Sequence, residues 1–230
     1  MFFYFVCFLY RKDCRACRRI IIVKRVKTEP KRVKCMKRLL ITGFEPFGGE
    51  RVNPSWEAVR QLPDRIGDWR LTRLRVPVVF GQAAETVLRA AEETRPDAVL
   101  CIGQAGGRAG VTPEAVAINL REASIPDNAG RRPANEPVRP GGPAAYFTTV
   151  PAREMVRAIR EADIPASLSL SAGAFVCNDL LYILLDHYDG TDTRVGFIHV
   201  PFLPEQAKEG QPALPIEKMI LALQRAIETL

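Results

Sequence analysis

From residue 36 onward, short runs that are apolar, or that alternate apolar and polar residues, are interspersed with amphipathic segments. The runs at residues 39–42, 69–79, 98–102, 114–120, 166–171 and 194–200 predict β-strands, and those at residues 53–62, 83–93, 151–162, 178–187 and 215–230 predict helices. Asn53 and Pro54 suit the N-cap and the first position of the first helix. Alternation of this kind predicts an α/β fold, a sandwich with a twisted, mainly parallel mixed sheet.

Three loops should meet at one edge of this sheet. Residues 43–49, residues 103–110 and the approach to Cys177 each follow a predicted strand. In open α/β sheets, sites form where loops leave the carboxyl ends of the strands. A Pro- and Gly-rich stretch at residues 124–142 shows no regular pattern, and loops of that length are usually functional or mobile.

Charge is distributed unevenly along the chain. Residues 1–35 contain 11 of the 33 basic residues but only 2 of the 26 acidic residues, so this segment carries +9 and the remainder −2. The formal net charge of +7 therefore does not indicate a nucleic-acid-binding domain. No apolar run reaches membrane-spanning length, so we expect neither nucleic acid nor a membrane as a partner.

Length and composition favour one domain, at residues 36–230, over two domains. We interpret residues 1–35 as a basic N-terminal extension, either disordered or an artefact of the start site, with Met36 as the true start. The rival interpretation is a genuine basic arm that touches membrane or nucleic acid. The six cysteines form no regular framework, which indicates a reducing compartment and a cytoplasmic location.

Cys177 and His199 are the candidate chemical pair. Small residues lead into Cys177 and a helical pattern follows it, so its sulfur should lie at a helix N-terminus, where N–H groups favour the thiolate. His199 lies at the end of a predicted strand, and imidazole is the usual base for a cysteine nucleophile. The alternative is an inert core cysteine and a core histidine. The second histidine, His187, suits a structural role at a helix end.

A third group should orient the imidazole, and carboxylates are its usual form. Glu114 is attractive because it begins an apolar strand after the glycine-rich loop, while Glu45 and Asp127 remain competitors. Phe44 and Phe47, on the loop at residues 43–49, suit an apolar pocket wall or a simple anchor to the core. That loop lacks the features of a phosphate-binding loop.

The chain resembles the pyroglutamyl peptidase I (pyrrolidone-carboxylate peptidase) family of cysteine peptidases. The matching segments are TGFEPFGG at residues 42–49, NPSW at 53–56, GQAGGR at 103–108, TPEAVAIN at 112–119, IPDN at 125–128, GGPAAY at 141–146, GAFVCN at 173–178 and FIHVP at 197–201. They occur in order over about residues 36–230. The resemblance implies a three-layer α/β/α sandwich of the phosphorylase/hydrolase-like type.

The resemblance also implies roles for individual residues. Cys177 would be the nucleophile, His199 the base and Glu114 the orienting acid. The predicted pocket residues for the pyroglutamyl group are Phe44, Phe47, Gln104, Ile125, Phe175 and Val176. Many family members carry arginine just before the IPDN motif, where this chain has Ser124, which leaves open what holds the oxyanion.

The expected function is removal of an N-terminal pyroglutamyl residue from peptides through a thioester, without metal or cofactor. The resemblance further implies a homo-oligomer, either a dimer or a tetramer. One alternative is a small-molecule-binding or nucleoside-phosphorylase-like protein on a similar scaffold. Another is a glutamine-hydrolysing amidotransferase domain, for which the aromatic loop gives no support.

Overall fold

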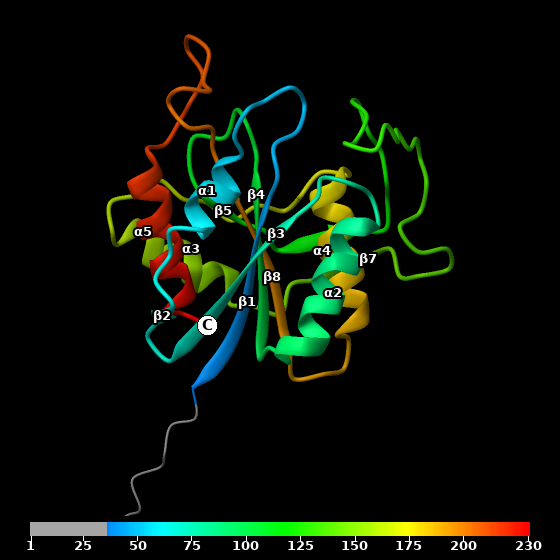
Figure 1. Cartoon of the computed structure of the whole chain (residues 1–230), viewed down its shortest axis with the longest axis horizontal. Helices are drawn as coiled ribbons and strands as arrows, with labels where there is room; N and C mark the ends of the chain where they lie inside the picture. The colour runs from blue at the N-terminus through cyan, green and yellow to red at the C-terminus, as the bar shows by residue number, and fades with distance from the viewer. Residues whose placement is uncertain (1–35) are drawn as a thin grey trace, which may run out of the picture. The chain divides into compact units, whose positions relative to one another are not determined.

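The computed structural model describes residues 36–230, and the predicted extension at residues 1–35 lies outside the described part of the chain. Its centre is a 6-stranded sheet with the strand order β2-β3-β1-β4-β8-β5 (Figure 1). The strands are β1 (Lys37–Phe44), β2 (Arg65–Ile66), β3 (Trp69–Val76), β4 (Ala98–Gln104), β5 (Thr112–Pro113) and β8 (Arg194–Val200). β3, β1, β4 and β8 are parallel, while β2 and β5 pair antiparallel at the two edges. The predicted mixed, mainly parallel sheet is confirmed.

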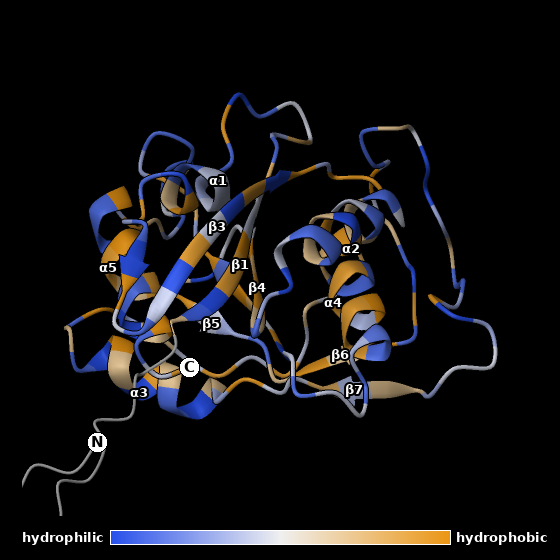
Figure 2. Ribbon diagram, turned by 60° about the horizontal axis from the view of Figure 1, so that its bottom comes forward, coloured by the Kyte–Doolittle hydropathy of each residue, from blue (hydrophilic) through white to orange (hydrophobic). Residues whose placement is uncertain are grey.

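Helices cover both faces of the sheet, which completes a three-layer α/β/α sandwich. One face carries α1 (Pro54–Val59), α3 (Ala152–Arg160) and α5 (Ile216–Ile227), and the other carries α2 (Gln82–Thr94) and α4 (Val176–His187). Each face has its own apolar core, and Figure 2 shows how largely apolar α4 is. The central strands are buried on both sides, as expected for parallel strands between two helix layers.

Local sequence signals explain where α1 begins. The Asn53 side chain accepts a hydrogen bond from the Ser55 N–H at 3.1 Å, and Pro54 occupies the first turn. Both features were predicted, because an asparagine N-cap satisfies a free N–H and proline needs no partner there. The helix ends at Val59, three residues before the predicted end, since residues 60–62 form a turn.

The strand predicted at residues 114–120 is wrong as a single element. The chain bends after Glu114, so that β5 joins the main sheet and β6 (Val116–Ile118) pairs instead with β7 (Ala145–Phe147). Residues 166–171 form only isolated bridges, at Ala166 and Ser169, rather than the predicted strand. Strand β3 ends at Val76, before the predicted residue 79. The two-residue β2 and the three-residue β7 were not predicted, because such short elements carry no periodic signal.

The carboxyl ends of the parallel strands meet where the sequence predicted. Gly43 at the end of β1 lies opposite Ile102 on β4, and Gly103 on β4 lies opposite His199 on β8. The loop at residues 43–49 and the glycine-rich loop at residues 103–110 leave from this edge. The start of α4 lies beside it, with the Cys177 sulfur next to Gly103, although no strand leads into this helix as the sequence had predicted. This edge therefore positions the candidate chemistry.

The long stretch at residues 124–142 contains no helix or strand but is held to the domain at several points. Asp127 accepts hydrogen bonds from the N–H groups of Phe80, Ala129 and Arg131 at 2.8 to 3.0 Å. Further along, the Arg139 N–H donates to the Asn119 side chain at 2.9 Å. These contacts favour an ordered loop over a mobile one. Within residues 36–230, no helix is long and apolar enough to cross a membrane.

Candidate active site

Cys177 is the second residue of α4, so its sulfur lies at a helix N-terminus as predicted. The helix starts at Val176, two residues earlier than predicted, which places the cysteine inside the first turn. No side chain caps this end, because the N-cap residue is Phe175. The first N–H groups of a helix have no intrahelical acceptor, so those around Cys177 are available to an anion.

His199 lies near the end of β8 and is only 3% exposed. Its Nδ1 lies 2.7 Å from Oε1 of Glu114. A carboxylate can only accept a hydrogen bond, so Nδ1 carries the proton and Nε2 is left as the basic nitrogen. The imidazole also packs against the ring of Phe197, with 4.7 Å between the ring centroids. The structure thus fixes both the tautomer and the orientation of the ring.

Gly103 lies between the cysteine on α4 and the histidine on β8. Gly103 on β4 is paired in register with His199 on β8. A Cβ atom added at Gly103 would lie 3.0 Å from Sγ of Cys177 and 2.7 Å from the Phe197 ring. The sulfur therefore lies directly over Gly103, next to the strand that carries the imidazole. Only a glycine leaves room for this close approach.

The structure distinguishes among the three carboxylates that the sequence left open. Glu114 is fully buried and is the one that contacts His199. Glu45 accepts hydrogen bonds from the Val78 N–H at 3.3 Å and the Asn128 side chain at 2.9 Å. Asp127 accepts hydrogen bonds from backbone N–H groups of its own loop and of Phe80. Glu114 alone is placed to orient the imidazole.

Burial is the largest influence on the ionisation of all three groups. Burial, reinforced by the Glu114 charge, raises the pKa of the Cys177 thiol to about 12. Burial also lowers the pKa of the His199 imidazole, against the opposing effect of Glu114. For Glu114 burial acts to raise the pKa. The hydrogen bond and charge of His199 and the hydrogen bonds from Ser169 and Arg108 outweigh this effect, so that the pKa is lowered. The resting site therefore holds a thiol, a neutral imidazole and a carboxylate.

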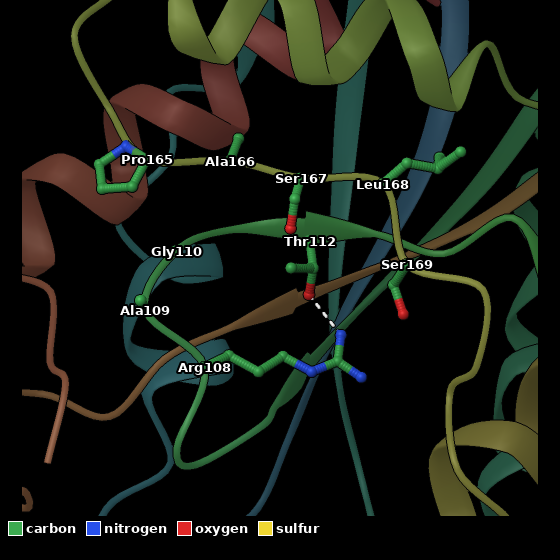
Figure 3. Close-up of a pocket in the computed structure, with 9 residues that line it drawn as sticks. All are labelled: Arg108, Ala109, Gly110, Thr112, Pro165, Ala166, Ser167, Leu168 and Ser169. Carbon is green, nitrogen blue, oxygen red and sulfur yellow. Dashed lines mark hydrogen bonds between the residues drawn. The ribbon is translucent and has the colours of Figure 1, made fainter.

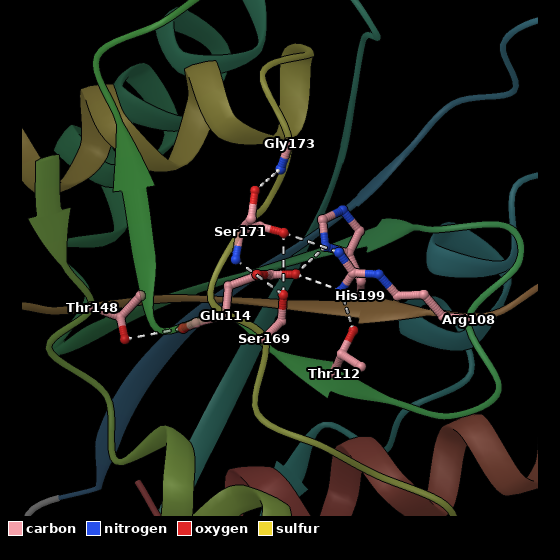
Figure 4. A network of polar contacts seen from close by, with 8 residues as sticks. All are labelled: Arg108, Thr112, Glu114, Thr148, Ser169, Ser171, Gly173 and His199. Carbon is pink, nitrogen blue, oxygen red and sulfur yellow. Dashed lines mark hydrogen bonds and ion pairs between the residues drawn. The ribbon is translucent and has the colours of Figure 1, made fainter.

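Arg108 belongs to the same polar network, which Figure 4 shows. Its Nη1 donates to Oε1 of Glu114 at 2.7 Å and to the hydroxyl of Thr112, and its Nη2 donates to the Ser171 carbonyl at 3.1 Å. The sequence predicted no role for Arg108, although this residue closes the GQAGGR segment. The available signal was an arginine within a glycine-rich loop between two predicted strands.

The predicted pocket residues divide into an accessible group and a buried group. Phe47 and Phe175 are partly exposed, with 6.2 Å between their ring centroids, and Ile125 is 41% exposed. Phe44 and Val176 are 2% and 0% exposed, so they lie beneath this surface in the core. The core-anchor interpretation therefore describes Phe44, while Phe47 keeps an accessible face.

Phe80, for which the sequence predicted no role, is only 5% exposed and packs against Phe175 from the core. Its ring meets the edge of Phe175 with 5.2 Å between centroids, and the Arg131 guanidinium lies 5.8 Å from its own centroid. Gln104, at the end of β4, is partly exposed, and its side-chain oxygen accepts from Gln206 at 3.4 Å. Ser124, which directly precedes the IPDN segment, is exposed.

Arg108, Thr112 and Ser169 of the polar network also line a groove of about 480 Å³ (Figure 3). Its lining residues are Arg108, Ala109, Gly110, Thr112, Pro165, Ala166, Ser167, Leu168 and Ser169. Neither Cys177 nor any predicted pocket residue lines it. Among residues 36–230, no group of three or more His, Cys, Asp or Glu side chains is placed to hold a metal ion.

Comparison with known proteins gives one consistent result. The family profile described as pyroglutamyl peptidase matches residues 37–230. A pyrrolidone-carboxylate peptidase of Erwinia tasmaniensis is 51% identical over 195 residues, covering 84% of this chain and 92% of that protein. Pyroglutamyl peptidase I from Bacillus amyloliquefaciens superposes with a TM-score of 0.81 at 46% identity, over 84% of this chain and 94% of that one. Pyrrolidone carboxyl peptidase from Thermococcus litoralis superposes with a TM-score of 0.80 at 35% identity, over 84% of this chain and 93% of that one.

The sandwich fold, with a cysteine, a histidine and a buried glutamate gathered at the carboxyl edge of its sheet, defines a cysteine-type hydrolase. The chain belongs to the pyroglutamyl peptidase family. Membership supports the peptidase interpretation over the nucleoside-phosphorylase-like and amidotransferase alternatives.

Proposed function

We propose that this enzyme removes an N-terminal pyroglutamyl residue from peptides, with Cys177 as nucleophile, His199 as base and Glu114 as orienting acid. The observation that carries the proposal is the buried hydrogen bond of 2.7 Å between His199 and Glu114. His199 lies on β8, which is paired with β4, and the Cys177 sulfur lies over Gly103 on β4. Such a nucleophile, base and orienting group make up the machinery of acyl transfer.

In the first half of the reaction, Nε2 of His199 takes the thiol proton as Sγ of Cys177 attacks the carbonyl that links the lactam ring to the next residue. The negative charge that develops on the carbonyl oxygen is met by backbone N–H groups at the start of α4, including that of Cys177. This source of stabilisation requires no side chain at position 124. The protonated imidazole then gives its proton to the departing amine, the C–N bond breaks, and a thioester remains.

In the second half, His199 removes a proton from a water molecule that attacks the thioester. The C–S bond breaks, the sulfur recovers the proton from the imidazolium, and free 5-oxoproline leaves. Glu114 keeps the imidazole in the productive tautomer throughout and stabilises its charged form. Over the two halves, every transferred proton passes between Cys177, His199, the departing amine and one water molecule.

The accessible aromatic surface suits the acyl group of this reaction. A pyroglutamyl residue has no free α-amine, so an ammonium-binding site cannot hold it, whereas a compact apolar slot can. Phe47, Phe175 and Ile125 supply the accessible apolar side chains, and Phe44 and Val176 support them from the core. Gln104 offers a polar contact at the strand end.

The test is hydrolysis of a chromogenic pyroglutamyl amide by the wild type and two cysteine variants. Cys177→Ser should lose at least about 1,000-fold in kcat/KM, because serine at this site lacks the reactivity of sulfur. Cys101→Ala, which removes the other cysteine in residues 36–230, should retain the activity of its folded fraction. Turnover by Cys177→Ser close to that of the wild type would contradict the nucleophile assignment.

The cellular and quaternary setting completes the proposal. We place the enzyme in the cytoplasm, as a homo-oligomer (dimer or tetramer), with residues 36–230 as the single catalytic domain and no metal or cofactor required. Support comes from the free cysteines Cys101 and Cys177 and from the family match, which starts at residue 37. Sedimentation velocity of the purified protein tests the assembly, and a monomer at micromolar concentration would contradict it.

A further inference from the structure

Arg108 connects three parts of the active site that lie apart in the sequence. Its guanidinium contacts Thr112 on β5, the buried Glu114, and the carbonyl of Ser171 in the segment that leads into Cys177. The side chain is 28% exposed, whereas its partner Glu114 is fully buried. Nη1 of Arg108 and Oε1 of Glu114 are 2.7 Å apart, and Glu114 is removed from solvent. Such a pair is screened less by water than a surface salt bridge.

Glu114 is shared between two donors at the same atom. Oε1 accepts from Nδ1 of His199 and from Nη1 of Arg108, each at 2.7 Å. The position of Arg108 therefore fixes the position of the oxygen to which the imidazole is hydrogen-bonded. A displacement of about 1 Å at such a position can cost a factor of about 100 in rate.

The connection to Ser171 extends this control to the nucleophile. The Ser171 carbonyl accepts from Nη2 of Arg108 and from the Ser169 hydroxyl, each at 3.1 Å. Ser171 lies six residues before Cys177, and the Ser171 hydroxyl accepts from the N–H of Gly173 at 3.2 Å in the same segment (Figure 4). Arg108 is thus bonded both to the orienting acid and to the segment that enters the nucleophile's helix.

We propose that Arg108 is a positioning residue of the catalytic reaction, which sets the Glu114–His199 pair against the segment that leads into Cys177. The inference rests on the proposed function. An arginine is needed because its planar guanidinium can donate to three partners at fixed angles, whereas a lysine ammonium is a point charge on a flexible stem.

The charges around the imidazole determine the direction of the effect. The titratable and charged groups that face His199 are Glu114 from the β5–β6 segment, Arg108 from the loop after β4, and Cys177 from α4. The positive charge of Arg108 lowers the pKa of His199, and it also lowers the pKa of Cys177 against the effect of burial. Removing that charge should raise the His199 pKa and so keep the base protonated, and inactive, up to a higher pH.

The experiment compares pH profiles of kcat/KM for Arg108→Met, Arg108→Lys and the wild type on a pyroglutamyl amide. Arg108→Met should lower kcat/KM about 100-fold and move the acid limb to higher pH. Arg108→Lys should keep the acid limb in place while recovering only part of the rate. Arg157→Met, an exposed arginine on α3, is the charge-matched control and should match the wild type.

Two outcomes would overturn the inference. An Arg108→Met enzyme that loses activity with an unmoved acid limb would show a purely structural role. If that variant does not fold, Arg108→Lys decides alone, since wild-type kcat or a displaced acid limb in this variant contradicts the proposal. Failure of the proposed function is distinguishable from failure of the Arg108 proposal. In that case the wild type would not hydrolyse the amide, or Cys177→Ser would remain active.

Discussion

A single carboxylate oxygen organises the active site at the scale of residues. Oε1 of Glu114 accepts from both His199 and Arg108, inside the protein, where the exposed fraction of Glu114 is 0%. Burial of a charge is costly unless it is paired and hydrogen-bonded, and these two donors provide both. Glu114 therefore stays ionised in a setting that would otherwise neutralise it.

Replacing Glu114 by glutamine tests this role through the sign of a pH shift. The Glu114 charge raises the His199 pKa, so Glu114→Gln should move the acid limb of kcat/KM to lower pH, opposite to Arg108→Met. The rate at the plateau should fall about 100- to 10,000-fold, because the tautomer and the imidazolium lose their support. Glu161→Gln, an exposed glutamate next to α3, should leave the profile unchanged. An acid limb that stays in place or rises would contradict the assignment.

At the scale of elements, the site depends on how closely α4 approaches the sheet. The start of α4 is fixed by Asn178, whose side chain bonds the backbone of Ile118 and Leu120 at 2.9 to 3.0 Å. Asp179 accepts from Arg121 at 2.6 Å and from the Gly81 N–H at 2.8 Å. These contacts hold Cys177 in place over β4.

Gly103→Ala should therefore disable the enzyme more than it destabilises it. The added Cβ would lie within 3.0 Å of the Cys177 sulfur and of the Phe197 ring, so both must move away from their positions. We expect kcat to fall about 100-fold. Gly196→Ala is the matched control on the next strand, since its Cβ would meet the Val150 side chain at 2.3 Å, far from the sulfur. Equal loss of specific activity in the two folded variants would contradict the close approach.

At the scale of the whole molecule, stability is coupled to the protonation of the buried histidine. The folded state lowers the pKa of His199, so the unfolded chain binds more protons as the pH falls below about 6.5. Stability should thus be lost from about pH 6.5 down to the folded pKa. The Glu114 contribution, from a carboxyl whose pKa is lowered, is lost only in a more acidic range.

Denaturant unfolding at a series of pH values measures this coupling. Below pH 6.5 the wild type should lose up to about 1.4 kcal/mol of unfolding free energy per pH unit through His199, and His199→Asn should lack this slope. His187→Asn, at the exposed end of α4, serves as the control and should keep the slope of the wild type. Identical slopes in the wild type and His199→Asn would show that burial of His199 does not affect the stability of the fold.

The sequence by itself determined the α/β class and the mainly parallel sheet, because hydrophobic periodicity distinguishes buried strands from amphipathic helices along the chain. It also indicated the cysteine, the histidine and a set of three carboxylates, since their residue types and motifs carry the chemistry. It missed β2 and β7, the bend after Glu114 and the loss of regular pairing at residues 166–171, where a few backbone bonds between distant segments decide the outcome. Only the tertiary structure showed that Glu114, rather than Glu45 or Asp127, contacts the imidazole, as the family resemblance had implied, and that Arg108 is hydrogen-bonded to Glu114. The physical reason is that a shared hydrogen bond depends on distances across strands, and these are set by packing of the whole sheet rather than by local pattern.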